Sequence, residues 1–366
     1  MPRVMGIVNF EEPHISLKGI NEHRPISATS YLGRYRIVDF PLSNLTNSGI
    51  QNIQVYMKVM SRSLVEHLGT GRQYNINSKR GKLHILCAND EQSTDINVFY
   101  RNMDITKDTD AEYVVITPSY LVYNIDFNKV IEKHIESKAD ITMVYKAVDN
   151  AREHYIGLDT LTIDNENRIE DFHVNLGKYK NRNVSLETYV MKKDLFLDLI
   201  LQAKAASSMY WLKDIVKDNV SNLNIHGYHM SGHCFCINSL DDYYAANMKM
   251  LDLKTATNFL TKNWPIHTQT NDSVPAYYDD TANVKCSIIA NGCQIRGRVS
   301  NCILGRGVIV EKGANIENSV VMPGVYIGKD VNVSYAIIDK KAVLNKVKDI
   351  NGESNRLIYI HRCDNI

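Results

Sequence analysis

The sequence lacks the features that mark several large classes of protein. Its 366 residues contain no run of about eighteen consecutive apolar residues, the length that a membrane-spanning helix needs. Lys and Arg together number 42 and Asp and Glu 41, so no excess of charge would draw the chain to nucleic acid or to an anionic membrane. We therefore expect neither a nucleic-acid partner nor a membrane partner.

Disulfide and secretion signals are also missing. The seven cysteines are odd in number and have no framework spacing, which fits reduced thiols better than disulfides. The first residues, MPRVMGIVNFEEPH, contain neither the hydrophobic core nor the cleavage site of a signal peptide. These absences lead us to expect a cytoplasmic protein. The chain is long enough for two or more domains.

Common catalytic motifs are absent as well. No G-x-S-x-G, H-E-x-x-H or P-loop sequence occurs. The basic stretches GRYRIVDF and NSKRGKLH are too short for a nucleic-acid footprint, and a solvated face or a small-anion site is the better interpretation.

The first predicted strand runs into a loop that has no glycine. Nucleotide-binding α/β domains usually place glycines and often a Lys or Arg there, so that backbone N–H groups reach the phosphates. Residues 9–17 read NFEEPHISL instead. The carboxylates of Glu11 and Glu12 repel a polyphosphate, and Pro13 has no N–H to donate. The loop is therefore unsuited to a nucleotide.

Up to about residue 250, short apolar strands alternate with amphipathic helices. The predicted strands cover residues 3–8, 50–57, 112–117, 140–147 and 157–164, and the predicted helices cover residues 40–49, 61–69, 126–138, 192–204 and 240–254. Asp126 is a suitable N-cap, and Gly49 suits a helix C-terminus. This alternation predicts a mostly parallel, doubly wound sheet with helices on both faces.

After a proline-containing linker the period changes to six residues. Apolar residues recur in this spacing at Ile289 and Ile295, at Ile303 and Ile309, and at Val321, Ile327 and Val333, with glycines between them. Such steps predict a parallel β-helix, whereas an irregular antiparallel sheet would show a period of two and hairpin signals. We predict an α/β domain over residues 1–254, a linker over 255–283 and a β-helix over 284–366, with RLIYIHRCDNI as a last strand-like tail.

The segment HGYHMSGHCFC raises the question of a zinc site. It contains three histidines with Cys234 and Cys236, and these residue types are the ligands that zinc prefers. However, the two cysteines alternate with Phe235 and Ile237, and no second ligand pair completes a tetrahedron. We interpret the segment as a half-buried strand whose thiols face inward, and we predict no metal site.

One long segment carries a family resemblance. GRYRIVDFPLSNLTNSGIQNIQVYMK, residues 33–58, resembles the signature that follows the nucleotide loop in bacterial glucose-1-phosphate adenylyltransferases, the ADP-glucose pyrophosphorylases of glycogen synthesis. AEYVVIT, LDDYYAANMKML and the glycine-containing repeats match in order over the whole chain. The resemblance implies a Rossmann-like nucleotidyltransferase (GT-A-like) domain followed by a left-handed parallel β-helix.

The chain departs from that family where its catalytic residues lie. Catalytic members have a G-G-x-G-x-R-L loop where this chain has Glu11 and Glu12. By alignment to their G-D-H-x-Y segment, Tyr120 stands in place of a metal-binding aspartate. By alignment to their W-R-D-V-G-T segment, Cys236 replaces a second one. The lysine that binds the sugar phosphate corresponds to Asn175, and the G-T-A-D motif is replaced around STDIN.

These replacements have a chemical consequence. The reaction needs Mg²⁺ held by carboxylates, and neither Tyr120 nor Cys236 offers a hard anionic oxygen at neutral pH. Asn175 cannot supply the positive charge of a lysine. We therefore expect no catalytic residue, no metal and no cofactor in this chain, which is predicted to be inactive or nearly so on its own; Mg²⁺ is expected only in a catalytic partner.

The pattern resembles the GlgD-type subunit of this family, which has little activity and assembles with a catalytic subunit into a heterotetramer. The resemblance implies a regulatory subunit in glycogen biosynthesis, a homo- or hetero-oligomer whose partner is a catalytic glucose-1-phosphate adenylyltransferase subunit. Two alternatives remain. One is a weakly active adenylyltransferase with Glu11, Glu12 and Asp95 as displaced ligands, and the other is a homo-oligomeric sensor of sugar phosphates.

Effector-controlled members of the family bind phosphate-bearing activators on basic residues. Three of these positions remain basic by alignment, namely Arg36, Lys340 and Arg362. Guanidinium and ammonium groups that converge would suit a phosphate. In the region that carries a further basic residue in relatives, this chain has Asn21 and Glu22 instead. The three basic residues are a candidate effector site.

Overall fold

The computed structural model describes residues 2–12, 15–17, 19–58, 61–77, 79, 81–88, 90 and 92–366, so Pro13 of the first loop and Ser78 and Arg80 of NSKRGKLH lie outside the described residues. Contacts divide the chain into two compact units. The first unit comprises Met1–Ile15, Val38–Cys236 and Trp264–His267, and the second comprises Ser16–Ile37, Ile237–Asn263 and Thr268–Ile366. The units are defined by contacts and not by independent folding, so the boundaries at 254 and 284 stay predictions.

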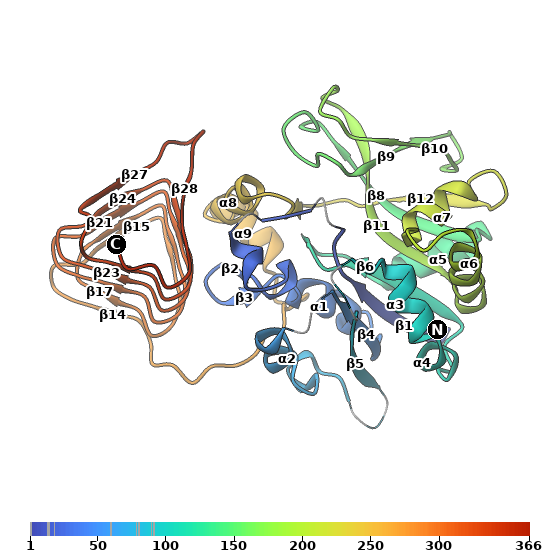
Figure 1. The fold of residues 1–366 in the computed structure, drawn as a ribbon, viewed down its shortest axis with the longest axis horizontal. Coiled ribbons are helices and arrows are strands. Elements are labelled where there is room, and N and C mark those ends of the chain that lie inside the picture. The colour runs from blue at the N-terminus through green and yellow to red at the C-terminus, as the bar shows by residue number, and fades with distance from the viewer. Residues whose placement is uncertain are drawn as a thin grey trace. The chain divides into compact units, whose positions relative to one another are not determined.

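The first unit is built on one large sheet (Figure 1). Among the described residues this sheet has nine strands. They are β1 (Val4–Asn9), β4 (Asn52–Met57), β5 (Lys82–Cys87), β6 (Tyr113–Pro118), β8 (Ile141–Val148), β9 (Asp159–Ile163), β10 (Ile169–Val174), β11 (Arg182–Lys192) and β12 (Ile225–His229). A two-stranded antiparallel sheet joins β7 (Leu121–Tyr123) to β13 (Cys234–Cys236).

The sheet is mixed rather than mostly parallel, which corrects the prediction. Strands β6, β1, β4 and β5 are parallel neighbours, as are β8 and β12. The long strand β11, which the sequence pattern did not reveal, lies antiparallel between β6 and β8. Strands β9 and β10 pair antiparallel. An antiparallel strand needs no crossover helix, so this part of the chain lacks the βα alternation that made the other strands visible.

The helices of the first unit cover both faces of its sheet. They are α1 (Asp39–Asn47), α2 (Arg62–Leu68), α3 (Asp95–Arg101), α4 (Met103–Lys107), α5 (Phe127–Ser137), α6 (Lys193–Ala206) and α7 (Leu212–Asp218). On β1, Gly6 faces Leu45 of α1 and leaves no room for a side chain, while Ile7 points to the opposite face. No helix among the described residues is long and apolar enough to cross a membrane.

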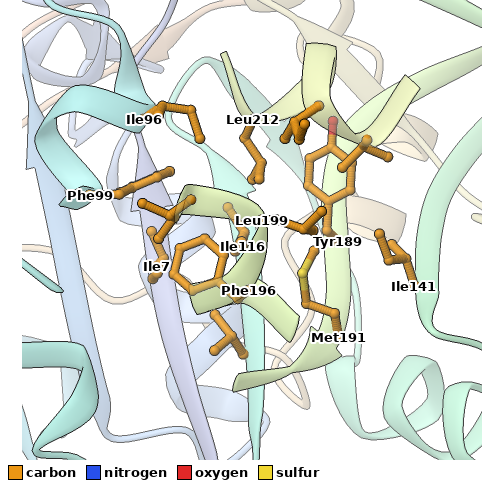
Figure 2. Close-up of a cluster of buried hydrophobic side chains, with 14 of the residues drawn as sticks. Ile7, Ile96, Phe99, Ile116, Ile141, Tyr189, Met191, Phe196, Leu199 and Leu212 are labelled. Carbon is orange, nitrogen blue, oxygen red and sulfur yellow. The ribbon is translucent and has the colours of Figure 1, made fainter. Parts of the chain in front are cut away.

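The core on the second face joins α3 and α6 to the strands (Figure 2). Phe99 of α3 and Phe196 of α6 meet edge to face at 5.4 Å, and Leu199 packs in the same cluster. Ile7 of β1 and Tyr189 of β11 lie in this cluster, with the hydroxyl of Tyr189 at the far end of its ring from the strand. Burial of these side chains stabilises the unit by about 1.5–3 kcal/mol for each fully buried one.

Two predicted helix ends are confirmed. The carboxylate of Asp126 accepts a hydrogen bond from the backbone N–H of Asn128 at 3.0 Å and so caps α5. Gly49 has a positive φ of 80° just after α1, and Ile50 N–H bonds the carbonyl of Leu45. The single predicted helix over residues 240–254 is wrong, because it divides into α8 (Leu240–Lys249) and α9 (Leu253–Phe259), with Asp252 as the N-cap of the latter.

The second unit contains a parallel β-helix with three flat sides (Figure 1). Its sides consist of three sets of strands. The first set is β14 (Tyr277–Tyr278), β17 (Gln294–Ile295), β20 (Ile309–Val310), β23 (Tyr326–Ile327) and β26 (Val343–Leu344). The second is β15 (Asn283–Lys285), β18 (Arg298–Ser300), β21 (Asn315–Glu317), β24 (Asn332–Ser334) and β27 (Asp349–Asn351). The third is β16 (Ile288–Ile289), β19 (Ile303–Leu304), β22 (Val320–Val321), β25 (Ala336–Ile338) and β28 (Ile358–Ile360).

The interior of the β-helix differs from the predicted stack at two steps. Ile295 and Val321 lie in the interior cluster, but Leu304 and Val310 take the places expected for Ile303 and Ile309. Successive side chains on a strand point to opposite sides, so a shift of one residue exchanges inside for outside. The period of six is confirmed, whereas its phase was wrong by one residue at these steps.

Segments that precede the β-helix in sequence pack on its third side. Helix α8 contacts β22, and the hydroxyl of Tyr244 donates a 2.7 Å hydrogen bond to the carbonyl of Asn318. The hairpin of β2 (Ser30–Tyr31) and β3 (Tyr35–Arg36) carries Gly33, which lies against the backbone of Leu304. The second unit therefore joins a segment from each end of the predicted α/β domain to the β-helix.

Candidate functional site

The loop that follows β1 is tied to the start of α7. The side-chain amide of Asn9 donates a 2.7 Å hydrogen bond to Asp95 Oδ2, and Asp95 Oδ1 accepts a 3.0 Å bond from the backbone N–H of Leu212. Next along the loop, Phe10 meets Trp211 edge to face with 5.7 Å between ring centroids. This contact places an aromatic pair where the strands β1 and β6 end.

An ion pair completes the connection. Glu12 Oε1 lies 2.5 Å from the ammonium nitrogen of Lys213, and the two side chains are only 12% and 14% exposed. The preceding residue, Glu11, is buried and accepts a 3.4 Å hydrogen bond from the Ser119 hydroxyl. The two acids of the first loop are thus both engaged within the protein.

Further acidic and phenolic groups gather around this ion pair. Glu187 stands at a β-bulge of β11, where the pairing with β8 shifts between Ser185 and Thr188. Its φ of 44° is unusual for a residue with a side chain, and bulges of this kind redirect a side chain. Glu187, Tyr120 and Tyr189 are close enough to influence one another's pKa, and burial and the charge of Glu187 raise the pKa of both phenols. Buried acidic and phenolic groups therefore gather beside the ion pair of Glu12 and Lys213.

The charges of this site shift several pKa values. Burial raises the pKa of Glu187 to about 7, with the negative charge of Glu12 adding to the rise and Lys213 opposing it. Burial likewise raises the pKa of Asp95 to about 7, against the hydrogen bonds that it accepts. The neighbouring acids Glu187 and Glu12 raise the pKa of Lys213, although burial opposes them. The cluster therefore holds more carboxyl groups than its ammonium groups neutralise.

Little space remains between these side chains. A cavity of about 20 Å³ is lined by Asn9, Phe10, Glu12, Asp95, Pro118, Glu187, Tyr189, Trp211, Leu212 and Lys213. That volume accommodates about one water molecule, whereas pockets for drug-sized ligands measure roughly 300–1,000 Å³. Among the described residues, the side chains of the first loop and of the start of α7 therefore leave little space between them.

Tyr120 and Cys236 lie close to each other in the structure. A negative charge on the Cys236 thiol would therefore raise the pKa of Tyr120. Burial is the main cause of that rise and holds the pKa of Tyr120 well above its ordinary value, so its phenol stays neutral. A neutral phenol and a thiol are poor ligands for Mg²⁺, which prefers charged oxygens. The donor set at these two positions does not fit the metal. Within the described residues, no group of three or more His, Cys, Asp or Glu side chains is arranged to hold a metal ion.

Asn175 does not join this cluster. Its side-chain amide donates hydrogen bonds to the carbonyl oxygens of Ala151 at 2.9 Å, Tyr155 at 3.0 Å and His154 at 3.2 Å. Its side-chain oxygen accepts a 3.1 Å bond from the N–H of Gly177. The position that the resemblance assigns to a sugar-phosphate lysine thus holds two loops together.

The interpretation of HGYHMSGHCFC as a structural strand is confirmed for its cysteines, which lie on β13, but the segment forms two strands, because its first histidines belong to β12. Cys234 and Cys236 are buried on β13, and Phe235 between them is half-buried. The ring of His233 stacks on that of Phe235 at 6.1 Å with an interplanar angle of 5°. This histidine is engaged with an aromatic ring on the same segment.

A second group of charges lies in the second unit. The predicted residues Arg36, Lys340 and Arg362 come close enough that the two arginines, together with Arg24, lower the pKa of Lys340 to about 7, although burial is the largest cause. Arg24 forms a buried ion pair with Asp339, whose other oxygen accepts a 2.8 Å bond from the Tyr359 hydroxyl. Four cationic side chains from distant parts of the sequence therefore converge.

Sequence reasoning missed several members of both groups. Lys213 and Glu187 carried no motif, and only the pairing of β11 and the start of α7 place them beside Glu12. Arg24 stands two residues after Glu22 in INEHRPI, so its charge was visible. Its partner Asp339 lies 315 residues further along the chain, and no local pattern connects the two.

Comparisons with known proteins agree with this architecture. The "Nucleotidyl transferase" family matches residues 17–252, and the "GlmU-like, C-terminal hexapeptide" family matches residues 273–356. Hexapeptide repeats of this kind form a left-handed β-helix, so the handedness that the resemblance implies is supported.

Individual relatives fall into two named groups. A glycogen biosynthesis protein GlgD from Geobacillus stearothermophilus is 31% identical over 318 residues, which cover 85% of this chain and 82% of that protein. GlgD from Bacillus subtilis is 27% identical over 366 residues, covering 98% and 96%. A glucose-1-phosphate adenylyltransferase from Fervidobacterium nodosum is 28% identical over 352 residues, covering 94% and 84%. By its two domains and these similarities, the chain belongs to the nucleotidyl transferase family, in the group of glucose-1-phosphate adenylyltransferases and GlgD proteins.

Proposed function

We propose that this protein is a non-catalytic regulatory subunit of a glucose-1-phosphate adenylyltransferase and acts in glycogen biosynthesis, in the cytoplasm. The observation that carries this proposal is the filled site of the first unit. Among the described residues, Phe10 packs on Trp211 and Glu12 pairs with Lys213, and the cavity that these four residues help to line measures about 20 Å³.

The donor chemistry supports the same conclusion. Nucleotidyl transfer needs a divalent metal to neutralise charge on the transferring group, and Tyr120 and Cys236 cannot hold one. Two of the acids named for a displaced metal site, Glu12 and Asp95, already make ionic or hydrogen-bonding contacts with other residues of the chain. Glu12 is paired with Lys213, and Asp95 accepts bonds from Asn9, Ile96 and Leu212. A weakly active enzyme is therefore the less favoured candidate.

The proposed partner is a catalytic glucose-1-phosphate adenylyltransferase subunit. Support comes from the relatives, since proteins that bear either name match this chain over most of its length. The proposed contribution of this chain to the complex is structural and regulatory. It offers a β-helix whose coils present repetitive flat sides, and such surfaces often pair between subunits.

A phosphate-bearing effector is the second element of the proposal. Arg36, Lys340 and Arg362 form a cationic group in the second unit, close to the buried ion pair of Arg24 and Asp339. A phosphate would relieve the repulsion among these groups and accept hydrogen bonds from the guanidinium groups. This cationic group also favours the alternative function, that of a homo-oligomeric sensor of sugar phosphates.

Co-expression with the catalytic homologue of the same organism tests the proposal. We expect tagged chain to retain the homologue through size-exclusion chromatography, and the complex to form ADP-glucose faster or with an altered effector response. The isolated chain is expected to show at most trace activity. Absence of a complex would leave the sensor alternative, and ordinary turnover by the isolated chain would contradict the proposal.

A further inference from the structure

Strand β10 ends the nine-stranded sheet of the first unit and has a neighbouring strand on one side only (Figure 1). That neighbour is β9, which pairs with it antiparallel from Ile169 to Val174. Strand β12 forms a single bridge, between Arg168 just before β10 and His226. From Glu170 onward, no strand in the described part of the chain pairs with the outer edge of β10.

The backbone of β10 turns hydrogen-bonding groups toward this unpaired edge. Asn175, directly after the strand, donates its N–H to the carbonyl oxygen of Leu158 at 2.8 Å, on the side of β9. Backbone groups alternate between the two edges of a strand, so those of Phe172 and Val174 point away from β9. The N–H of Phe172 bonds the exposed carboxylate of Asp171 at 2.7 Å. That carboxylate takes the place of the carbonyl oxygen of a partner strand.

Apolar side chains follow the same segment beyond the end of the core. Phe172 is half-buried and packs on the core of the first unit, whereas Val174 is 52% exposed and Leu176 is 66% exposed. Their spacing of two residues places the three side chains on one face of an extended backbone. At the opposite end of the sheet, the one exposed residue of β5 is Lys82, and lysine commonly protects edge strands from pairing. Strand β10 contains neither lysine nor proline.

Charge is divided between the two ends of this segment. Glu170 and Asp171 are exposed near its start, and Lys178 and Lys180 are exposed just after its end. A segment that is acidic at one end and basic at the other is complementary to an antiparallel copy of itself. Self-complementarity of this kind is what a two-fold interface requires.

We infer that the outer edge of β10 is an interface between two copies of this chain, which pair antiparallel about a two-fold axis at Val174. In this register Val174 faces Val174 of the second copy, Phe172 faces Leu176, and Glu170 faces Lys178. The axis makes each of the last two pairs occur twice. Opposite charges and apolar side chains that face each other across strands stabilise the pairing. The segment is short, so we expect a weak dimer with a dissociation constant in the micromolar range.

The inference concerns copies of this chain alone, so it and the proposed regulatory role succeed or fail separately. The experiment is sedimentation velocity of the full-length wild-type chain at about 1–500 µM, without the catalytic homologue. We expect an association step that depends on concentration. Glu170→Lys and Lys178→Glu should each weaken this step about ten-fold, because each replaces two pairs of opposite charge by two pairs of like charge. Glu170→Lys/Lys178→Glu should regain the wild-type association, since the axis restores opposite charges.

Matched variants separate this edge from general effects of charge. Glu132→Lys and Lys129→Glu make the same changes at exposed positions of α5 and should leave the association unchanged.

Substitutions of Val174 test the backbone contribution. Val174→Pro removes the outward N–H and should abolish the association, whereas Val174→Thr keeps both the N–H and the β-branched shape and should retain more of it. Because this N–H points away from β9, Val174→Pro should still fold, as circular dichroism will show. If it does not fold, Val174→Asp places a charge at the same point without changing the backbone and should also abolish the association.

Three results would overturn the inference. The first is a wild-type chain that stays monomeric over the whole concentration range, including one that associates only when the catalytic homologue is added. The second is an association that is as strong in Glu170→Lys and Lys178→Glu as in the two α5 variants. The third is a double variant that associates as weakly as the single ones. The second result would assign the association to another surface, such as the flat sides of the β-helix.

Discussion

The side-chain amide of Asn175 donates a 2.9 Å hydrogen bond to the carbonyl oxygen of Ala151 and so joins two loops that lie 24 residues apart. With its bonds to His154, Tyr155 and Gly177, both polar atoms of this 4% exposed side chain are used inside the first unit. We expect Asn175→Ala to lower the free energy of unfolding by roughly 1–3 kcal/mol, because several backbone groups lose their partner.

Thermal unfolding of Asn175→Ala beside Asn150→Ala provides the measurement. Asn150 is an exposed residue of the same turn, so its replacement should leave the midpoint nearly unchanged. Asn175→Lys should destabilise at least as much as alanine, since the lysine would bury an unpaired charge. Equal midpoints for the two alanine variants would contradict the structural role of Asn175.

Restoring the two aspartates should not restore catalysis. In Tyr120→Asp/Cys236→Asp the metal ligands return, but Glu12 still pairs with Lys213 and Phe10 still packs on Trp211. We expect ADP-glucose formation by this variant alone to stay at trace level. A turnover number in the ordinary range of roughly 1–1,000 per second would show that the filled cleft is no obstacle.

Glu187 should make stability depend on pH. Its pKa is about 7 in the folded chain, chiefly because of burial, against roughly 4.3 in an unfolded one. Between these values the folded state binds more protons than the unfolded state, so stability falls as pH rises from about 4 to about 7 and is constant above. The slope for this one group is at most roughly 1.4 kcal/mol per pH unit.

Comparison of wild type with Glu187→Gln over this range isolates the contribution. The variant should unfold at a higher temperature than wild type at pH 8, and this advantage should shrink toward pH 4. Glu166→Gln, at an exposed position, serves as the control and should show no such trend. A difference that is independent of pH would contradict the shifted pKa of Glu187.

Effector binding to the second unit should be linked to protons. Burial and the nearby arginines hold the pKa of Lys340 at about 7, so part of the population is uncharged at neutral pH. A bound phosphate group would raise this pKa and cause proton uptake, and affinity should fall as pH rises from 7 to 9. Calorimetry of a sugar bisphosphate in buffers of different ionisation enthalpy measures the uptake directly.

Arg36→Ala should weaken that binding by about ten-fold, the size of one charge-assisted hydrogen bond, whereas Lys329→Ala at an exposed position of the β-helix should not. If the binding enthalpy does not depend on the ionisation enthalpy of the buffer, Lys340 does not take up a proton and is not part of the site. If Arg36→Ala binds the sugar bisphosphate as tightly as wild type, Arg36 is not part of the site.

Alanine substitutions at Gly33 and Gly307 distinguish the cost of backbone strain from the cost of a packing clash in the second unit. Both have a positive φ, of 69° and 68°, so alanine should cost about 1 kcal/mol at either position. A Cβ on Gly33 would also lie 2.6 Å from the carbonyl oxygen of Leu304, while a Cβ on Gly307 meets nothing within 4 Å. Gly33→Ala should therefore lower the unfolding midpoint clearly more than Gly307→Ala, and similar shifts would contradict the packing of this hairpin on the β-helix.

The sequence by itself determined what local chemistry can determine. The period of six follows from the geometry of a coil with three short sides, so it was readable without a structure. Asp126 and Gly49 marked helix ends because capping involves only neighbouring residues. The residue types at positions 120 and 236 likewise argue against metal binding wherever those side chains lie.

Only the tertiary structure decided which groups meet. Glu12 and Lys213 stand 201 positions apart, and the pairing of β1 with β6 and of β11 with both β6 and β8 brings them together. The contact of Arg24 with Asp339 arises in the same way. Such contacts depend on the packing of the whole unit, and their energy exists only after the chain has folded. No local pattern in a sequence records them, and for this reason these two ion pairs emerged only from the structure.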